Sequence, residues 1–591
     1  MIKLPEGRHS KRATSIEHLF VALFLLFMLS GVCQISAQSN YSKGYFRSPV
    51  DYPLSLSGSF GEIRPNHFHS GIDIRTGGQV GKPVYAIADG YVSRIFISPW
   101  GFGKAVYINH ASGHISVYAH LHHFTWKIAK FARKQQYKRE SFYLDTTVPT
   151  GQIQIRKGDV IGYSGCSGSS SGPHLHFEIR DMRTQEPMDP LAFGIPIKDN
   201  IRPKIRWVKI YPYDEYSMVN FVSQPLMTKT VGGGKSYGIS LKDTIMVSGN
   251  IFFGIEAYDY HDNSSIRCGI KSIELFVDEE LIFGQQVDRY EFKDSRYVNA
   301  ILDYSQNQKN KLRIQRSYIA PGNWLDIFHD VVNNGIVGFY DSGLHKILYI
   351  VKDVHGNTSK LIFWVKSHPP APGGARPRET SKPRNKFIWD LPNSFETTNI
   401  RFQMPAMALY EDIDFKYQAS PPVNGSYARV HELHEKGTPI HLRCSLSIRA
   451  ETLPRWLESK ALVAKVGKKD TFISLGGSFK DGFVTTRIRE FGEYTIRVDT
   501  IPPTINPVNI YHNKNISKQR TITMTISDEF SGIKRYRGTL NGKWILMDFD
   551  AKRKRLVYKY DDRIKPGSNK FHLVITDGVG NKTEFRATLI R

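Results

Sequence analysis

The sequence predicts a mainly β protein that is divided into several domains. Short apolar segments of alternating polarity, separated by glycine turns, recur along most of the chain, as in "VYAIADGYVSRIF" (84–96) and "HLHFEIR" (174–180). A length of 591 residues is too great for one hydrophobic core. The hydrophobic content of 40% and the charged content of 23% are typical of folded chains, so the domains are expected to be globular.

The N-terminus predicts export. Lys3, Arg8 and Lys11 precede the apolar run 19–29, and the small residue Ala37 follows it. This order is typical of a secretory signal peptide over residues 1–37. The run is shorter than the ~20 residues that a membrane-spanning helix needs, although a retained anchor is the alternative. We therefore expect a protein of the periplasm or cell envelope.

The cysteines do not predict a disulfide framework. Only Cys166, Cys268 and Cys444 would remain after cleavage, an odd and sparse set for an exported chain. A bridge between Cys268 and Cys444 is an alternative without support in the pattern. We expect hydrophobic cores to hold the domains.

The net charge of +25 suits an anionic partner, which could be nucleic acid, lipid or a wall polymer. The sequence shows no RNA-binding signature and no helix-turn-helix pattern. Its basic residues are spread along the chain. These observations argue against nucleic-acid binding and favour a basic solvated surface.

Changes in composition and in the strand and turn pattern predict five segments after the signal peptide. Residues 268–357 and 531–581 share an order of features, namely a Gly-Ile-Lys strand start, a hairpin, a Gly-led strand and an Asp-x-x-Gly-Asn turn. They are interpreted as two copies of one β-sandwich (Ig-like) module, with an insertion in the first. The turns Asp353–Asn357 and Asp577–Asn581 favour Asn- and Gly-stabilised backbone, with calcium binding as the alternative. The predicted segments are a first domain at 45–198, a β-sandwich module at 199–366, a Pro/Gly/basic linker at 367–386, a β-rich domain at 387–500 and a C-terminal β-sandwich module at 501–591.

One segment of the first domain departs from the β pattern. Residues 124–141 carry apolar side chains at helical spacing among many basic ones. We expect an amphipathic helix that packs on the domain with a solvated basic face. The alternative is an insertion that flanks a cleft or touches an anionic surface.

A set of histidines and one aspartate predicts a metal site in the first domain. His174 and His176 share one face of a predicted strand, while Leu175 and Phe177 point to the other. The segment "HFHSGIDI" adds His69 and Asp73, with Gly71 to let the backbone bend. Three nitrogen and oxygen ligands with one open position are what a catalytic Zn²⁺ site requires.

The order "FGEIRPNHFHSGIDI", "PVYAIADGYV", "VYAHL" and "GDVIGYSGCSGSSSGPHLHFEIR" resembles that of the LytM/lysostaphin-type zinc metallopeptidases of peptidase family M23, over about residues 45–195. The resemblance implies an antiparallel β-sheet groove and peptidoglycan stems or cross-bridges as substrates. It implies that His69, Asp73 and His176 bind one zinc ion and that His120 and His174 are catalytic without binding the metal. It gives Arg64 a supporting role and Cys166 none. The stretch 122–149 is longer than the family's minimal core, which bears on the choice of substrate.

The sequence therefore predicts an exported zinc metalloendopeptidase that hydrolyses peptide bonds in peptidoglycan stems or cross-links. The alternative is a non-catalytic envelope scaffold or a regulator of another wall hydrolase, but all five family positions are filled here. A third hypothesis is that the enzyme cleaves proteins outside the cell wall. The β modules are interpreted as spacers, inhibitory covers or platforms for envelope protein partners. The segment "HELH" (His431–His434) leaves only two residues between its histidines, whereas a helical zinc motif needs three.

Overall fold

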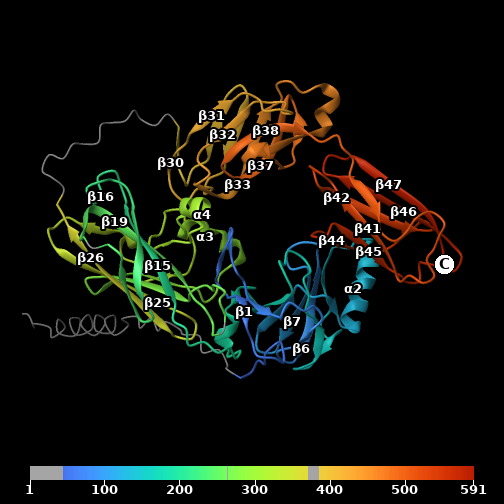
Figure 1. Ribbon diagram of the computed structural model, residues 1–591, viewed down its shortest axis with the longest axis horizontal. Coiled ribbons are helices and arrows are strands. Elements are labelled where there is room, and N and C mark those ends of the chain that lie inside the picture. Colours follow the sequence, from blue (N-terminus) through green and yellow to red (C-terminus); the bar gives the residue numbers. More distant parts are fainter. Residues whose placement is uncertain (1–43, 242, 263, 370–384) are drawn as a thin grey trace, which may run out of the picture. The chain divides into compact units, whose positions relative to one another are not determined.

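Strands account for 47% of the residues in the computed structural model, against 9% for helices. The structure describes residues 44–591 apart from 242, 263 and 370–384. The predicted signal peptide lies outside the described residues, as does most of the predicted linker. The expected mainly β fold is confirmed (Figure 1).

The first domain is built on an antiparallel sheet. Near the centre of this sheet, the strand that begins at His174 pairs with the strand that ends just before His120. Across this sheet the strands are β1 (Leu56–Gly58), β4 (Ile72–Arg75), β13 (His174–Asp181), β8 (His114–Ala119), β7 (Lys104–His110), β6 (Gly90–Ile97) and β10 (Leu144–Thr147). Smaller pairings add β11 (Gln154–Ile155) to β6 and β14 (Pro187–Met188) to β13. A second, three-stranded sheet consists of β5 (Pro83–Tyr85), β12 (Val160–Tyr163) and β9 (His123–Phe124).

Strand β13 separates a core face from a polar face, as its alternation predicts. Leu175, Phe177 and Ile179 have no exposed surface. His176 pairs in register with Asp73 of β4 on one side and with Ala119 of β8 on the other. Because His120 follows Ala119 directly, three of the predicted site residues lie on adjacent strands.

The helix expected at 124–141 is present as α2 (Trp126–Arg139). Its buried residues, Ile128, Ala132 and Gln136, recur every four positions and so form one face against the domain. The helix ends where Glu140 adopts a left-handed conformation and its N–H bonds back to the last turn. The prediction of an amphipathic helix packed on the domain is confirmed.

Residues 204–367 surround a second core with one continuous sheet. Its longest strands are β15 (Lys204–Pro212), β17 (Leu226–Gly233), β19 (Ile245–Tyr258), β20 (Ser272–Val277), β21 (Glu280–Gln286), β25 (Leu344–Lys352) and β26 (Thr358–Ser367). Strand β19 is long enough to pair with β15 along one half and with β26 along the other, which closes the sheet. Between β21 and β25 lie the short helices α3 (Val298–Ile301) and α4 (Tyr304–Asn310).

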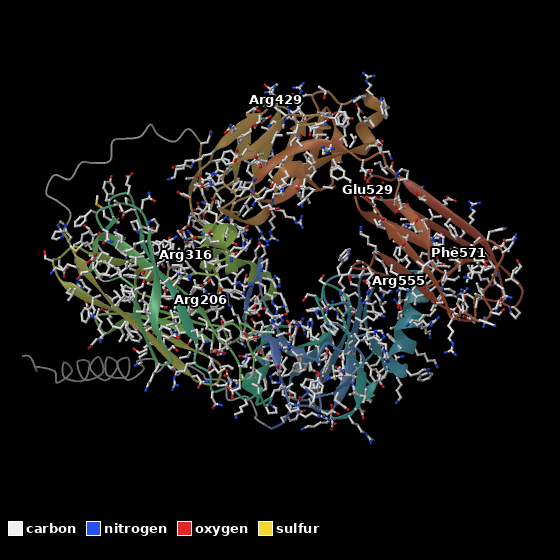
Figure 2. The ribbon with its side chains drawn as sticks, viewed as in Figure 1. Arg206, Arg316, Arg429, Glu529, Arg555 and Phe571 are labelled. Carbon is white, nitrogen blue, oxygen red and sulfur yellow. The ribbon has the colours of Figure 1, made fainter. Side chains whose placement is uncertain are left out.

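The remaining chain forms two further pairs of larger sheets, each around its own core, and a two-stranded sheet of β27 (Lys386–Phe387) and β30 (Ile413–Asp414). One pair contains β29 (Ile400–Met404), β33 (Pro439–Arg449), β37 (Phe483–Glu490), β32 (Val430–Leu433), β34 (Ala461–Val466) and β38 (Gly492–Val498). The other contains β41 (Thr521–Ser527), β45 (Arg555–Lys559), β42 (Ile533–Leu540), β46 (Ser568–Asp577) and β47 (Lys582–Ile590). Phe571, labelled in Figure 2, belongs to this last core.

A separate apolar cluster supports the segment that carries His69. Phe60, Ile63 and Phe68 pack there against Tyr290 and Val298. The backbone of Phe68 is also held at both polar groups, because its N–H donates to Ser295 Oγ (2.8 Å) and its carbonyl accepts from Tyr290 Oη (3.0 Å). The stretch between β21 and β25 thus helps to position the first domain's site.

The three cysteines that the structure describes are free thiols, so the alternative of a bridge between Cys268 and Cys444 is wrong. Within residues 44–591, as far as they are described, no helix has both the length and the apolar character needed to cross a membrane.

Candidate metal and catalytic site

Three predicted ligands converge to hydrogen-bond distance of one another. His69 Nε2 lies 3.0 Å from His176 Nδ1 and 3.1 Å from Asp73 Oδ1, and His176 Nδ1 lies 3.0 Å from the same oxygen. All three side chains are nearly inaccessible to solvent. Gly71 permits this approach, since a Cβ there would lie 2.2 Å from the carbonyl oxygen of Phe177.

The outer hydrogen bonds of the two imidazoles fix which nitrogens face inward without a proton. His69 Nδ1 lies 2.7 Å from the carbonyl oxygen of Ser59, which can only accept, so Nδ1 carries the proton. His176 Nε2 donates in the same way to Glu178 Oε1 at 2.8 Å. The inward nitrogens therefore offer lone pairs to one another and to a carboxylate oxygen. Such an arrangement needs a positive charge at its centre, either from a metal ion or from a proton on His176 Nδ1.

The electrostatics of the group agree with that requirement. Burial lowers the pKa of His69 to about 4, so this ring is neutral and can act as a ligand. Burial alone would also lower the pKa of His176, but the carboxylates of Asp73 and Glu178 raise it to about 9. A proton on His176 thus provides the positive charge when no metal is bound.

Arg64, the residue with a predicted supporting role, forms an ion pair with Asp73. Arg64 Nη2 donates to Asp73 Oδ2 at 2.6 Å, which leaves Oδ1 to the histidines. Burial alone would raise the pKa of Asp73, but the three histidines lower it well below its usual range. Glu62 lies 3.5 Å from Arg64 and 3.4 Å from Arg313 and extends the ion-pair network outward.

Sequence reasoning assigned no role to Glu178, although this residue completes the site. It accepts from His176, from Ser70 Oγ and from Arg180 Nε (2.5 Å), and its side chain has no exposed surface. A carboxylate behind a ligating histidine orients the ring and raises its basicity. The signal was present in the sequence, because Glu178 is the next residue after His176 on the same strand face.

The two predicted catalytic histidines lie beside the three ligands. The ring centroids of His120 and His174 are 4.8 Å apart, and His120 is 5.8 Å from His176. His120 Nδ1 lies 2.9 Å from the carbonyl oxygen of Ser167, and His174 Nδ1 lies 2.9 Å from that of Gly172. Both rings therefore carry a proton on Nδ1. Nε2 of His120 is left as an acceptor, whereas Nε2 of His174 faces Asp73 Oδ1 at 3.4 Å.

His120 is neutral at physiological pH. Burial and the nearby rings of His176 and His174 lower its pKa to about 3. Its backbone has a positive φ of 58°. This conformation is uncommon for non-glycine residues and occurs preferentially at functional sites. The loop 165–172 supplies the carbonyls that orient both rings, so it serves the site through its backbone.

The structure places the other histidines of the sequence analysis away from this site. His431 lies on β32, where its Nδ1 bonds to Tyr417 Oη (2.9 Å), and His434 Nε2 bonds to Thr438 Oγ1 (3.0 Å). The Sγ atom of Cys166 lies within the loop, 3.6 Å from Ser170 Oγ.

Comparison with known protein families identifies the domain. Residues 67–137 and 134–190 match the profile of peptidase family M23. These ranges contain the three predicted metal ligands and the two predicted catalytic histidines. Residues 67–190 form a family M23 peptidase domain. Residues 384–499 match the Zu5-like domain, so a second domain of known type lies toward the C-terminus.

Three curated relatives resemble the M23 region. The DD-carboxypeptidase/endopeptidase Mpg of Neisseria meningitidis serogroup B is 34% identical over 128 residues, which are 22% of this chain and 23% of that protein. The glycyl-glycine endopeptidase ALE-1 of Staphylococcus capitis is 29% identical over 26% of this chain and 34% of its own. The peptidoglycan DD-endopeptidase ShyC of Vibrio cholerae is 29% identical over 23% of this chain and 27% of its own. The similarity thus spans only about a quarter to a third of these relatives.

Proposed function

We propose that the chain is an exported zinc metalloendopeptidase that hydrolyses peptide bonds in peptidoglycan stems or cross-links, in the periplasm or cell envelope. The observation that carries the proposal is the convergence of three metal-ligating side chains, His69, Asp73 and His176, beside two histidines that are each oriented by a hydrogen bond from Nδ1. This arrangement favours an enzyme over a non-catalytic scaffold.

The donor set fits zinc. Two imidazole nitrogens and one carboxylate oxygen form the ligand triad typical of catalytic zinc, which keeps a fourth position open. Ligands of a tetrahedral ion at about 2.0–2.1 Å lie about 3.3 Å apart. The separations of 3.0–3.1 Å are close to that value. When bound, the zinc ion supplies Lewis-acid polarisation of the scissile carbonyl and makes water acidic enough to attack at neutral pH.

The protein's own residues would prepare the site and move the protons. Arg64 holds Asp73 Oδ2 in place, and Glu178 keeps Nδ1 of His176 directed inward. His120, neutral because of its low pKa, offers Nε2 as a proton acceptor. His174, with Nε2 3.4 Å from Asp73 Oδ1, lies where it can return a proton to the leaving amine or stabilise the oxyanion.

Peptidoglycan is the favoured substrate for two reasons. The curated relatives with similar M23 regions are named for endopeptidase action, one of them explicitly on peptidoglycan. The net charge of +25 suits an anionic wall polymer. The helix α2 lies within the stretch 122–149, which the resemblance marks as longer than the family's minimal core, and this stretch bears on which peptide bond is cut.

Metal analysis and defined substrates test the proposal. The full chain should bind about one zinc ion in its M23 domain and release new peptide termini from purified muropeptides. His69→Ala should lose both the metal and the hydrolysis. Full activity in metal-free protein would refute the mechanism. Zinc binding without any hydrolysis of wall peptides would favour the scaffold.

A further inference from the structure

A second group of buried carboxylates lies in the β module that follows the M23 domain. Carboxylate oxygens of Asp199, Asp259 and Asp353 lie within 4.8 Å of one another. Asp259 is 2% exposed and Asp353 is 3% exposed, and the side chain of Asp199 has no exposed surface. Three carboxylates at this separation repel one another strongly in a buried setting.

Asp259 points into this group without a hydrogen-bond partner. Its Oδ1 atom is buried and receives no hydrogen bond within the part of the chain that the structure describes. Burial and the charges of Asp353 and Asp199 raise the pKa of Asp259 to about 9. A buried carboxylate oxygen with two like-charged neighbours is the place where a bound cation would be most stabilising.

The other two carboxylates are already held in fixed positions. Asp353 Oδ1 accepts from the N–H of Asn357 (2.9 Å), which confirms that the Asp-x-x-Gly-Asn segment forms a hydrogen-bonded turn. Asp199 Oδ1 accepts from the N–H of Ile201 (3.0 Å). A carboxylate oxygen has two lone pairs, so these turns orient the oxygens and still leave them able to bind a cation.

The C-terminal module contains a second group of three aspartates. Carboxylate oxygens of Asp499, Asp528 and Asp577 also lie within 4.8 Å of one another. Glu529, labelled in Figure 2, marks this position in the fold because it follows Asp528.

The two clusters agree in the contacts of their first and third aspartates and differ at the second, because Asp528 Oδ2 accepts from the N–H groups of Phe530 (3.1 Å) and Gly532 (2.6 Å). Asn357 Nδ2 donates to the carbonyl of Asp199 (3.2 Å), and Asn581 Nδ2 donates to that of Asp499 (3.0 Å). Ile501 N donates to Asp499 Oδ1 (3.2 Å), as Ile201 N does to Asp199. The carboxylate triad is therefore a shared property of both modules.

We propose that each module binds one hard divalent cation of the calcium class, through Asp199, Asp259 and Asp353 in the first and through Asp499, Asp528 and Asp577 in the second. Oxygen-only ligand sets select such cations over transition metals. Two imidazoles do approach the first cluster, with His261 Nδ1 3.1 Å and His355 Nδ1 3.4 Å from Asp199 Oδ2. The second triad has no such neighbour in the described chain, so the carboxylates are the common ligands.

The cation would join three parts of each module. In the first module Asp199 precedes β15, Asp259 follows β19, and Asp353 lies in the turn between β25 and β26. In the second, Asp499 precedes the module's strands, Asp528 follows β41, and Asp577 ends β46. Binding would thus fix the chain where it enters each module.

Calcium titration of the full chain tests the proposal. The protein is stripped of metal, reloaded with zinc and titrated with Ca²⁺ by calorimetry, with Mg²⁺ and Zn²⁺ in parallel. We expect one Ca²⁺ per module with dissociation constants of about 10⁻⁴–10⁻³ M, as in extracellular modules, and a higher melting temperature with Ca²⁺.

Isosteric variants assign the sites. Asp259→Asn and Asp528→Asn should each remove one calcium ion per chain, and the double variant should remove both and lose the Ca²⁺-dependent rise in melting temperature. Asp326→Asn, which changes an exposed aspartate in the first module, is the matched control and should bind as the parent does.

Two results would overturn the proposal. One is the absence of Ca²⁺ binding up to about 10 mM, well above the expected range, or binding that survives in the double variant. The other is a preference for Zn²⁺ over Ca²⁺ that His261→Ala removes, which would assign the first cluster to the imidazoles. Neither result depends on the peptidase activity.

Discussion

Replacement of Glu178 by glutamine tests whether the carboxylate that accepts a hydrogen bond from His176 strengthens metal binding and stabilises the fold. The substitution keeps the size of the side chain and removes its charge. Glu178 accepts from His176 Nε2 at 2.8 Å and from Arg180 Nε at 2.5 Å. Glutamine can still accept one hydrogen bond, but it cannot neutralise His176 and Arg180.

The magnitude follows from these contacts. Loss of a carboxylate behind a ligating histidine typically costs 10–100-fold in metal affinity, which corresponds to about 1.4–2.7 kcal/mol. The guanidinium of Arg180, whose side chain is 6% exposed, would also lose its buried partner. Breaking one partner of a buried pair costs about 3–5 kcal/mol. We expect weaker zinc binding and a lower free energy of unfolding.

Chelator competition measures the zinc affinity, and urea unfolding followed by circular dichroism measures the stability. Asp145→Asn is the matched control, because it breaks a carboxylate–arginine pair in the same sheet, with Arg94 Nε at 2.7 Å, on the edge strand β10. That pair is partly exposed, so its loss should cost about 0.2–1 kcal/mol and leave zinc affinity unchanged. Zinc affinity within about twofold of the parent in folded Glu178→Gln would refute the reasoning.

Three further predictions follow from the site and its support. Asp73→Ala should abolish metal binding and hydrolysis, as measured by elemental analysis and muropeptide digestion, and retained zinc would contradict its assignment as a ligand. His120→Ala and His174→Ala should each keep the zinc and lose about 10²–10⁴-fold in turnover; unchanged turnover would remove the residue from the catalytic set. The third concerns Asp303, which accepts from Lys209 Nζ (2.6 Å) and Tyr211 Oη (2.9 Å). Burial alone would raise the pKa of Asp303, but these contacts lower it. Its stabilisation is thus present above its unfolded pKa of about 3.9 and lost as the pH falls through the folded value. The difference in unfolding free energy between the parent and Asp303→Asn should therefore shrink from pH 6 toward pH 3, and a constant difference would contradict the assignment.

The alternation along β13 made its geometry readable from the sequence. A period of two places His174 and His176 on one face, and Leu175 and Phe177 in the core, whatever the neighbouring strands are. The order of the motifs carries the resemblance to family M23, and that resemblance predicted that His69, Asp73 and His120 lie near His176. Local pattern was also sufficient for α2, whose buried residues follow the helical period.

Features that depend on contacts between distant segments could not be predicted in the same way. The hydrogen bond from the backbone N–H of Phe68 to Ser295 Oγ joins residues 227 positions apart, and no local pattern indicates it. The triads of Asp199 and Asp499 each assemble three aspartates from separate turns. The sequence indicated only the Asp-x-x-Gly-Asn turn of each, because the other members lie beside the ends of strands whose pairing it does not specify.

The most direct test of the central claim is the mass-spectrometric detection of new peptide termini in purified peptidoglycan. The full chain is incubated with the wall as isolated, after chelation and after zinc is restored, with His176→Ala as the comparison. We expect new termini from the parent with zinc, their loss on chelation, their return with zinc and none from His176→Ala. Termini released equally by His176→Ala, or by the chelated parent, would contradict a metal-dependent peptidase at this site.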